Sequence, residues 1–187
     1  MAFSINDVQA NFRFEGARNT LFKVSITNPI NSSADQVTEY LVSAAALPES
    51  RLGNIGVPYF GRVVNFAGDR TYEPWTVTVM NDEDFKVRNA LEEWSNAINK
   101  RVENKRSELA AANHNYKSTA TVTQLSKTGK ELRTYRLNGV YPADISDIRL
   151  DWGDFNAFER FNVTFVYDYW EIVNAGLTGT GDAGGIR

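Results

Sequence analysis

Cysteine is absent from the 187 residues, and histidine occurs once, at position 114. Without cysteine the chain forms no disulfide and offers no thiolate to a metal ion. Lysine and arginine together number 20 against 23 acidic residues, so the formal net charge of −3 gives no overall attraction to nucleic acid. No apolar run approaches the roughly 20 residues that cross a bilayer, and residues 1–7 lack the basic start of a secretory signal. We therefore expect no membrane insertion and a protein made and kept in a cytoplasm.

The apolar content is high enough for a folded core. Hydrophobic residues make up 42% of the chain and aromatic residues 12%, which excludes disorder over most of its length. The length favours one domain, and we place it at residues 1–173. Within it, residues 1–16 show no sustained period and are expected to be mobile in an isolated subunit. The glycine-rich residues 174–187 are expected to form a flexible tail.

Alternating apolar and polar residues predict several β-strands. Trp75, Val77 and Val79 fall on one face of a strand at residues 75–80, and Thr76 and Thr78 fall on the other. Similar patterns predict strands at residues 20–27, 37–46, 118–125, 132–140, 148–152 and 158–170, with a hairpin turn at 127–130 and a strand end at Tyr141-Pro142.

One segment has a convincing helical period. Apolar residues recur at three- and four-residue spacing from Phe85 to Val102, and Asn81 or Asp82 is placed to cap the helix. The acidic residues 82–84 would then occupy the first turn, where they suit the positive end of the helix dipole. The sequence therefore predicts a mainly β, α+β fold with one flanking helix.

Residues 49–68 differ from the rest of the chain. They carry four glycines, Pro58 and short runs of apolar residues such as Tyr59-Phe60. We expect a long irregular arm or hairpin, and a connection of this length is usually functional or held by a partner.

Three sequence patterns resemble a nucleotide, metal or catalytic site, but none of them meets the requirements of such a site. Residues 179–184 match the spacing G-x-G-x-x-G, but that motif needs a helix after it, and the sequence stops three residues later. Asp144, Asp147, Asp151 and Asp154 are better explained as solvated turn residues than as a metal site, because their spacing does not put them on one strand face. His114 has no nucleophile or second histidine near it in the sequence. We therefore expect no enzyme and no cofactor.

The segment Ala67–Glu83 resembles the tail tube proteins of T-even-like contractile-tailed bacteriophages. Three shorter segments resemble the same family and follow in the family's order around it: Ala44–Pro48, Ile148–Trp152 and Asp168–Glu171. Together they span roughly residues 18–171. The departures are a longer segment between the helix and the strand at 118–125, and the glycine-rich tail.

The resemblance implies an antiparallel β-sandwich or barrel-like subunit that closes into a hexameric ring. Stacked rings would form the hollow inner tube for DNA passage inside a contractile sheath. The implied partners are further copies of the chain, the sheath protein, baseplate and tube-terminator proteins, and, in the lumen, the tape-measure protein and genomic DNA. The implied location is the virion tail, assembled in the bacterial host cytoplasm.

Exposed aromatic residues outside the predicted core are the candidates for contacts between subunits. Tyr59 and Phe60 in the arm have no obvious partner within one domain, and glycines allow the arm to reach another ring. At the N-terminus, further apolar residues could dock on the next subunit: Phe3, Ile5, Phe12 and Phe14. For the wall that faces the channel we expect a polar, neutral to acidic surface, since exposed cations would bind DNA phosphates.

Two other functions are compatible with the sequence. The first is a tube subunit of a related contractile injection system, such as a bacteriocin particle or a type VI secretion tube. The second, of another class, is a soluble β-sandwich that binds small ligands or carbohydrate, which would remain monomeric and show a ligand pocket.

Overall fold

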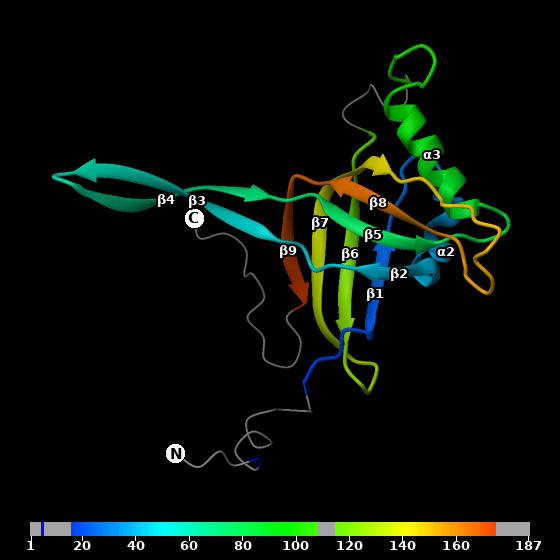
Figure 1. The fold of residues 1–187 in the computed structure, drawn as a ribbon, viewed down its shortest axis with the longest axis horizontal. Helices are drawn as coiled ribbons and strands as arrows, with labels where there is room; N and C mark the ends of the chain where they lie inside the picture. The colour runs from blue at the N-terminus through cyan, green and yellow to red at the C-terminus, as the bar shows by residue number, and fades with distance from the viewer. Residues whose placement is uncertain (1–4, 6–15, 108–114, 175–187) are drawn as a thin grey trace.

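The computed structural model describes residue 5, residues 16–107 and residues 115–174 (Figure 1). Its elements follow in the order β1 (Phe22–Ile26), the 3-10 turn η2 (Ser32–Ala34), α2 (Asp35–Leu41), β2 (Val42–Ala45), β3 (Ser50–Tyr59), β4 (Arg62–Tyr72), β5 (Trp75–Met80), α3 (Lys86–Ile98), β6 (Ser118–Leu125), β7 (Glu131–Ile145), β8 (Arg160–Val166) and β9 (Tyr169–Asn174). The predicted mainly antiparallel β architecture is confirmed, with a second α-helix in the described part of the chain.

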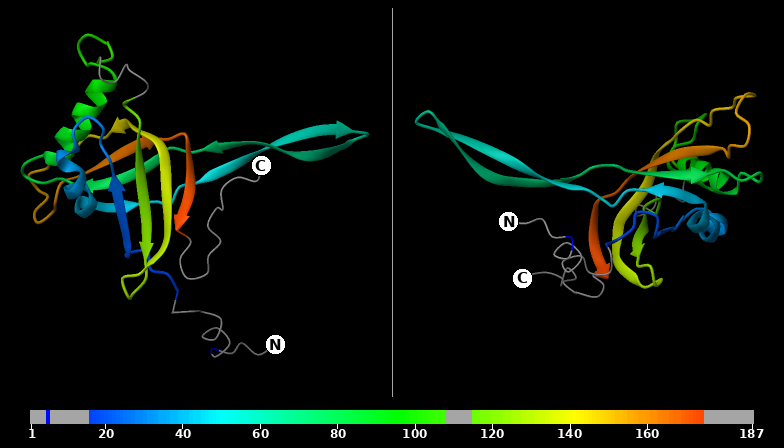
Figure 2. Two further views of the ribbon diagram at one scale, coloured as in Figure 1. Left: turned by 180° about the vertical axis from the view of Figure 1, so that it is seen from behind. Right: turned by 60° about the horizontal axis from the view of Figure 1, so that its bottom comes forward.

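Two antiparallel sheets share one long strand. Sheet A contains β1, β6, β7 and β9, and sheet B contains β2, β5, β8 and the C-terminal part of β7. The two groups of strands run in crossed directions in Figure 1. Strands β3 and β4 pair only with each other and form an arm that projects from the sheets in every view of Figures 1 and 2.

The two sheets are joined by a bend at Gly139. Strand β8 pairs with residues 141–145 of β7, and β9 pairs with residues 134–138, so β8 and β9 follow one another along the same edge. Between them the Asp168 amide donates to the Asn138 carbonyl at 2.9 Å. At the bend in β7, Gly139 has φ +72°. This left-handed conformation costs a residue with a Cβ about 1–2 kcal/mol.

The core lies between the two sheets and beneath α3. Sheet B contributes the apolar face predicted for residues 75–80, which pairs in register with the apolar face of β8. Trp94 of α3 is fully buried and reaches the ring of Phe165, and its indole N–H donates to the Tyr116 carbonyl at 2.8 Å. The fully buried large side chains are Trp94, Phe161, Phe165, Leu137, Val24, Val77, Val79, Val122, Val140 and Val163.

Helix α3 begins later than predicted. It starts at Lys86, after Phe85 in a left-handed conformation with φ +52°, and it has no acidic residue in its first turn. Asp82 instead closes the preceding turn: its carbonyl accepts from the Phe85 amide, and its carboxylate accepts from the Lys86 amide at 3.1 Å. The apolar stripe ends at Ile98, and Val102 lies beyond the helix with 95% of its surface exposed.

The prediction of a strand over residues 37–46 is wrong in its first half. A helix, α2, occupies residues 35–41, and only 42–45 form a strand. Asn31 caps the 3-10 turn η2 that leads into this helix, since its side chain accepts from the Ser33 amide at 3.0 Å. Ala34 and Thr38 are buried, and Leu41 packs against the core; their spacing of four and three residues is helical.

Three further strand boundaries need correction. Strand β7 continues through Pro142 to Ile145, because its pairing with β6 ends at Val140 and the proline then lies on a free edge, where its missing N–H costs little. Residues 148–152 form no strand and belong to the loop between β7 and β8. The predicted strand at 158–170 is two strands, and the bend turns Tyr169 away from the buried face of β8.

Among the described residues, no helix is both long and apolar enough to cross a membrane.

Candidate assembly surfaces

The base of the arm is anchored to the bend between β8 and β9. The Glu49 carbonyl accepts from the Tyr167 hydroxyl at 3.2 Å and from the Trp170 indole at 3.3 Å. The rings of Tyr72 and Tyr167 lie 5.9 Å apart between centroids. Burial, together with the nearby Tyr72, Glu49 and Glu73, raises the pKa of the Tyr167 hydroxyl, which therefore stays a hydrogen-bond donor at neutral pH. The arm thus leaves a rigid corner of the domain.

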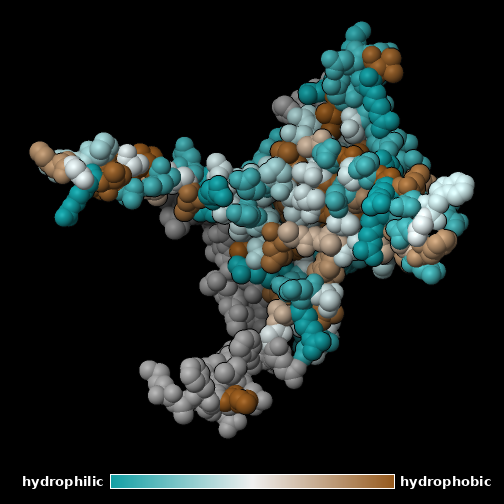
Figure 3. All heavy atoms as spheres, in the orientation of Figure 1, coloured by the Kyte–Doolittle hydropathy of each residue, from teal (hydrophilic) through white to brown (hydrophobic). Residues whose placement is uncertain are grey.

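Beyond its base the arm has no protein layer on either face in the described structure. Its two strands pair over residues 50–59 and 62–72, and Figure 3 shows apolar residues, in brown, spaced along it among polar ones. A two-stranded ribbon alone is marginal in water, so these side chains need a partner. The exposed large apolar residues of the arm are Leu52, Ile55, Val57, Tyr59, Phe60, Val63, Val64 and Phe66.

The tip of the arm presents two aromatic rings in a strained turn. Phe60 has φ +43° and Gly61 has φ +78°, and a bulky residue in the left-handed region is unusual. Phe60 is 92% exposed and meets the ring of Tyr59 edge-on, with 4.6 Å between centroids. Backbone strain at an exposed aromatic residue points to a functional contact rather than to stability.

Sheet A has two free edges in the described structure. β1 pairs only with β6, and β9 pairs only with β7. The four strands alternate in direction, as Figure 1 shows, so the β9 edge of one copy would meet the β1 edge of another in antiparallel orientation. Free edges of this kind are templates for pairing with another chain.

The face of sheet A that points away from the core is polar and electrically balanced. The Thr123 and Thr134 hydroxyls lie 3.1 Å apart in its middle. Arg136 pairs with Glu171 at 3.6 Å, and Lys23 pairs with Glu39 of α2 at 2.7 Å. The hydrogen bond to Glu39 raises the pKa of Lys23, so this cation is held charged and close to an anion.

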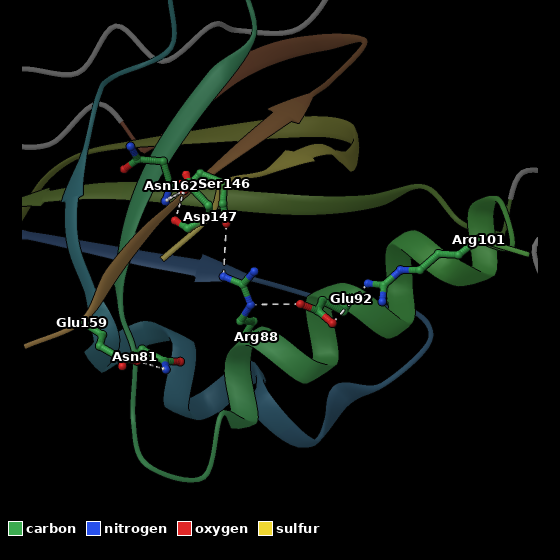
Figure 4. Close-up of polar contacts among 8 residues, drawn as sticks. All are labelled: Asn81, Arg88, Glu92, Arg101, Ser146, Asp147, Glu159 and Asn162. Carbon is green, nitrogen blue, oxygen red and sulfur yellow. Dashed lines mark hydrogen bonds and ion pairs between the residues drawn. The ribbon is translucent and has the colours of Figure 1, made fainter. Parts of the chain in front are cut away.

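A polar network fixes both ends of the loop at residues 146–159 (Figure 4). Arg88 of α3 donates to the Ser146 carbonyl at 3.2 Å and to Glu92 at 2.9 Å. At the other end, the Asn81 amide donates to the Glu159 carbonyl at 2.9 Å and its side chain to the Glu159 carboxylate at 2.8 Å. The loop is therefore anchored to α3 at Ser146, and at Glu159 to Asn81, which lies in the connection between β5 and α3.

Among the described residues, the structure brings two of the predicted contact residues, Tyr59 and Phe60, together. Tyr59 and Phe60 form the arm tip, Ile5 is exposed, and Phe3, Phe12 and Phe14 lie outside the described residues. His114 and the glycine motif at 179–184 also lie outside them. Within the described ranges, no three histidine or carboxylate side chains converge to hold a metal ion. Sequence reasoning missed the exposed loop at 146–159, which it had treated in part as a strand.

Comparisons with known proteins agree with this architecture. The family model for the phage tail tube protein matches residues 5–173. The chain is 33% identical over 178 residues to the tail tube protein gp19 of Enterobacteria phage T4, covering 89% of this chain and 99% of that protein. A tail tube protein of Serratia phage KSP90 is 28% identical over 150 residues, covering 78% and 82% of the two chains. The chain belongs to the phage tail tube protein family.

Solved structures show the same fold at low sequence identity. A chain of the anti-feeding prophage baseplate superposes with a TM-score of 0.60 at 13% identity, covering 87% of this chain and 98% of that one. A chain of an extracellular contractile injection system, in its PVC sheath–tube complex, gives 0.55 at 13% identity, covering 91% and 98%. This tail tube subunit is a structural component of a virion tail, and its family is not enzymatic.

Proposed function

We propose that six copies of this subunit close into a ring, and that rings stack into the hollow tube through which genomic DNA passes inside a contractile sheath. The single observation that carries the proposal is the pair of free, antiparallel-compatible edges on sheet A of a tail tube family member. Joining these edges from copy to copy satisfies their unpaired backbone groups and closes sheet A, which removes both of its edges.

The same closure assigns the two faces of sheet A. Sheet B and α3 cover the apolar face, so the polar face with Thr123 and Thr134 lines the channel. Arg136 and Lys23, which would otherwise bind phosphates, are paired there with carboxylates. Duplex DNA then finds few free cations on this wall and gains little by counterion release, which favours passage over retention.

The arm connects rings in this proposal. It extends away from sheet A, and one strand of ten residues spans roughly 33 Å at the rise of an antiparallel strand. Burial of Tyr59 and Phe60 against a copy in the next ring would stabilise stacking by several kcal/mol, on the order of 1.5–3 kcal/mol per side chain before ordering costs.

The further partners follow from the relatives. Solved structures with this fold come from particles that also contain a baseplate, a sheath or a tube terminator. We extend these partner classes to this subunit, and we add a tape-measure protein and DNA in the lumen and assembly in the host cytoplasm. A tube of a contractile injection particle is the second candidate; the 33% identity to a phage tail tube protein over nearly its whole length favours the phage tail.

Negative-stain microscopy of the purified protein tests the proposal. Wild-type protein should form hollow tubes at high concentration or on an added baseplate, and light scattering should follow their growth. The Tyr59→Ser, Phe60→Ser double variant should fold normally but stop stacking, because both side chains are exposed in the single subunit.

Val102→Ser is the matched control, since Val102 is about as exposed as Phe60 but lies far from the arm in sequence and beyond α3. Monomers of the wild type under all of these conditions would refute tube formation. Tubes of normal length from the double variant would refute the role of the arm alone.

A further inference from the structure

The arm consists of two parts that pair in different registers. Close to the domain, residues 50–52 pair with residues 70–72, and further out residues 54–59 pair with residues 62–67. The pairing shifts by one residue between these parts, so β4 carries one more residue than β3 at the junction. This is a β-bulge, which interrupts the ladder and increases the local twist. We call the two parts the inner arm and the outer arm.

Two glycines face each other at this junction. Gly53 of β3 lies opposite both Gly68 and Asp69 of β4. A Cβ on Gly53 would lie 3.2 Å from the Asp69 carbonyl oxygen, and a Cβ on Gly68 would lie 3.2 Å from the Gly53 carbonyl carbon. Neither glycine has a positive φ, so it is the close approach of the two backbones that requires them. Two of the three residues at the junction thus bring no side chain to stiffen it.

The inner arm is fixed to the domain. The Glu49 carbonyl, which precedes β3, accepts from the Tyr167 hydroxyl and from the Trp170 indole. Across the inner arm, the Arg70 guanidinium donates to the Ser50 hydroxyl at 3.0 Å. These contacts hold both strands of the inner arm at their base.

The outer arm has internal contacts of its own. The Asn54 side-chain amide donates to the Asn65 side chain at 3.1 Å, and the rings of Tyr59 and Phe60 meet at the tip. Every residue of its two strands is exposed. In the part of the chain that the structure describes, no side-chain hydrogen bond or ion pair joins the outer arm to the inner arm. The two parts of the arm are therefore braced separately.

The twist of the arm is visible in its outline. Its two strands cross part-way between the sheets and the tip in Figures 1 and 2. A two-stranded ribbon is stiffened by ladder hydrogen bonds and by cross-strand pairs of side chains. At the bulge the ladder is interrupted and the glycines supply no such pair, so the ribbon bends and twists most easily there.

We propose that Gly53 and Gly68 form a hinge about which the outer arm changes direction while the inner arm stays on the domain. Hinges are a few residues that absorb the change in backbone angles between two parts that each keep their shape. Six residues of each outer strand span about 20 Å, so a swing of about 30° moves the tip by roughly 10 Å. The anchored base thus stays in place while the tip, with Tyr59 and Phe60, samples several directions in a free subunit.

In an assembled tube, neighbouring copies would select one of these directions. That step rests on the proposed function, whereas the hinge in the free subunit does not.

Spin-label distances in the free subunit test the hinge, because the natural chain has no cysteine that would also take the label. Lys86→Cys places one label at the start of α3, and Arg62→Cys places the second at the tip, beyond the hinge. The matched control combines Lys86→Cys with Arg51→Cys in the inner arm. All three side chains are exposed. We expect a distribution of distances wider by roughly 10 Å for position 62 than for position 51.

Two results of this measurement would overturn the inference. Equally narrow distributions for the two pairs would show that the arm moves as one rigid body with the domain. An equally wide distribution for position 51 would place the motion at the base of the arm and not at the glycines.

Removal of the bulge supplies a second test. Deleting Gly68 and introducing Gly53→Thr leaves residue 53 opposite Asp69 alone, and the pairings on both sides are kept. Threonine adds a β-branched side chain that suits a strand. The distribution for position 62 should then narrow to the width found for position 51. An unchanged width would contradict a hinge at this junction.

Measurement in tubes separates this inference from the proposed function. In tubes diluted with unlabelled subunits, the distribution for position 62 should narrow, because neighbouring copies fix the direction of the outer arm. A distribution that stays wide in tubes would refute the selection of one direction. If no tubes form, the proposed function fails, and the widths measured in the free subunit still decide whether the hinge exists.

Discussion

Replacing Gly139 by alanine perturbs the bend that passes β7 from sheet A to sheet B. The residue has φ +72°, and an added Cβ would lie 2.1 Å from Oδ2 and 2.6 Å from Cγ of Asp168. Ordinary contact begins at 3.4 Å, so the carboxylate has to move away. That movement separates Asp168 from Lys117, whose Nζ now lies 2.7 and 2.8 Å from its two oxygens.

The cost can be built from three effects. The left-handed conformation costs alanine about 1–2 kcal/mol, of which about 0.4–1 kcal/mol is offset in the unfolded chain. Loss of the partly exposed Lys117–Asp168 pair adds at most about 1 kcal/mol. Strain on the hydrogen bond from Asp168 to the Asn138 carbonyl adds about 0.5–1.5 kcal/mol. We expect Gly139→Ala to lower the free energy of unfolding by about 2–3 kcal/mol.

Gly129 provides the control. It has φ +77° in the turn between β6 and β7, and an added Cβ there meets nothing within 4 Å. Gly129→Ala should therefore cost only the conformational part, about 1 kcal/mol or less. Urea unfolding of the monomer, followed by the fluorescence of the four tryptophans, measures both variants.

Removing the Asp168 carboxylate, with which the new Cβ clashes, should recover part of the lost stability. In Gly139→Ala with Asp168→Ala the two closest contacts disappear, and only the Asp168 Cβ at 3.2 Å remains. The double variant should therefore be more stable than the sum of the two single effects predicts. Equal costs at positions 139 and 129, or strict additivity in the double variant, would refute the steric account of the bend.

Two further predictions concern alkaline stability and the channel wall. Because burial raises the pKa of Tyr167 above 10.0, the folded state keeps that proton longer than the unfolded state, and stability should fall as the pH rises through this range. Tyr167→Phe should cost about 1 kcal/mol of stability at neutral pH through the lost hydrogen bond to Glu49, and it should remove this fall in stability. Lys117→Met should remove only the fall in stability above pH 10.5 that the raised pKa of Lys117 causes. Urea unfolding midpoints measured against pH distinguish the two variants. Wild-type tubes should retain duplex DNA poorly in low-salt filter binding. Glu171→Gln removes the carboxylate that pairs with Arg136, so it should increase DNA retention in a salt-sensitive way. Tight DNA binding by wild-type tubes would contradict an electrically balanced channel wall.

The sequence alone determined the elements whose pattern is local. The alternation at residues 75–80 predicted a strand with one buried face, and the structure confirms that face in register with β8. The period from Phe85 to Val102 predicted α3, although its first and last turns were misplaced. These elements bury one face each, and burial of one face leaves a period of 2 or 3.6 in the sequence.

Tertiary structure decided the rest. Whether Val37 to Leu41 forms helix or strand depended on the 3-10 turn η2, capped by Asn31, that leads directly into α2, and on packing against the core, which outweighed local β-propensity. Strand β7 continues past Pro142 only because β6 has already ended there. The break in the last strand at Asp168 comes from the bend at Gly139, 29 residues away in sequence.

The candidate surfaces divide in the same way. The aromatic tip of the arm was visible in the sequence, because Tyr59-Phe60 lies among glycines with no local partner. The outward position of Trp152 was not, since an apolar residue in a short alternating run predicts burial. Only the network that fixes the ends of its loop to α3 and β8 leaves that side chain in solvent. Spacing along the chain encodes which residues share a face, but long-range contacts decide whether that face has a neighbour.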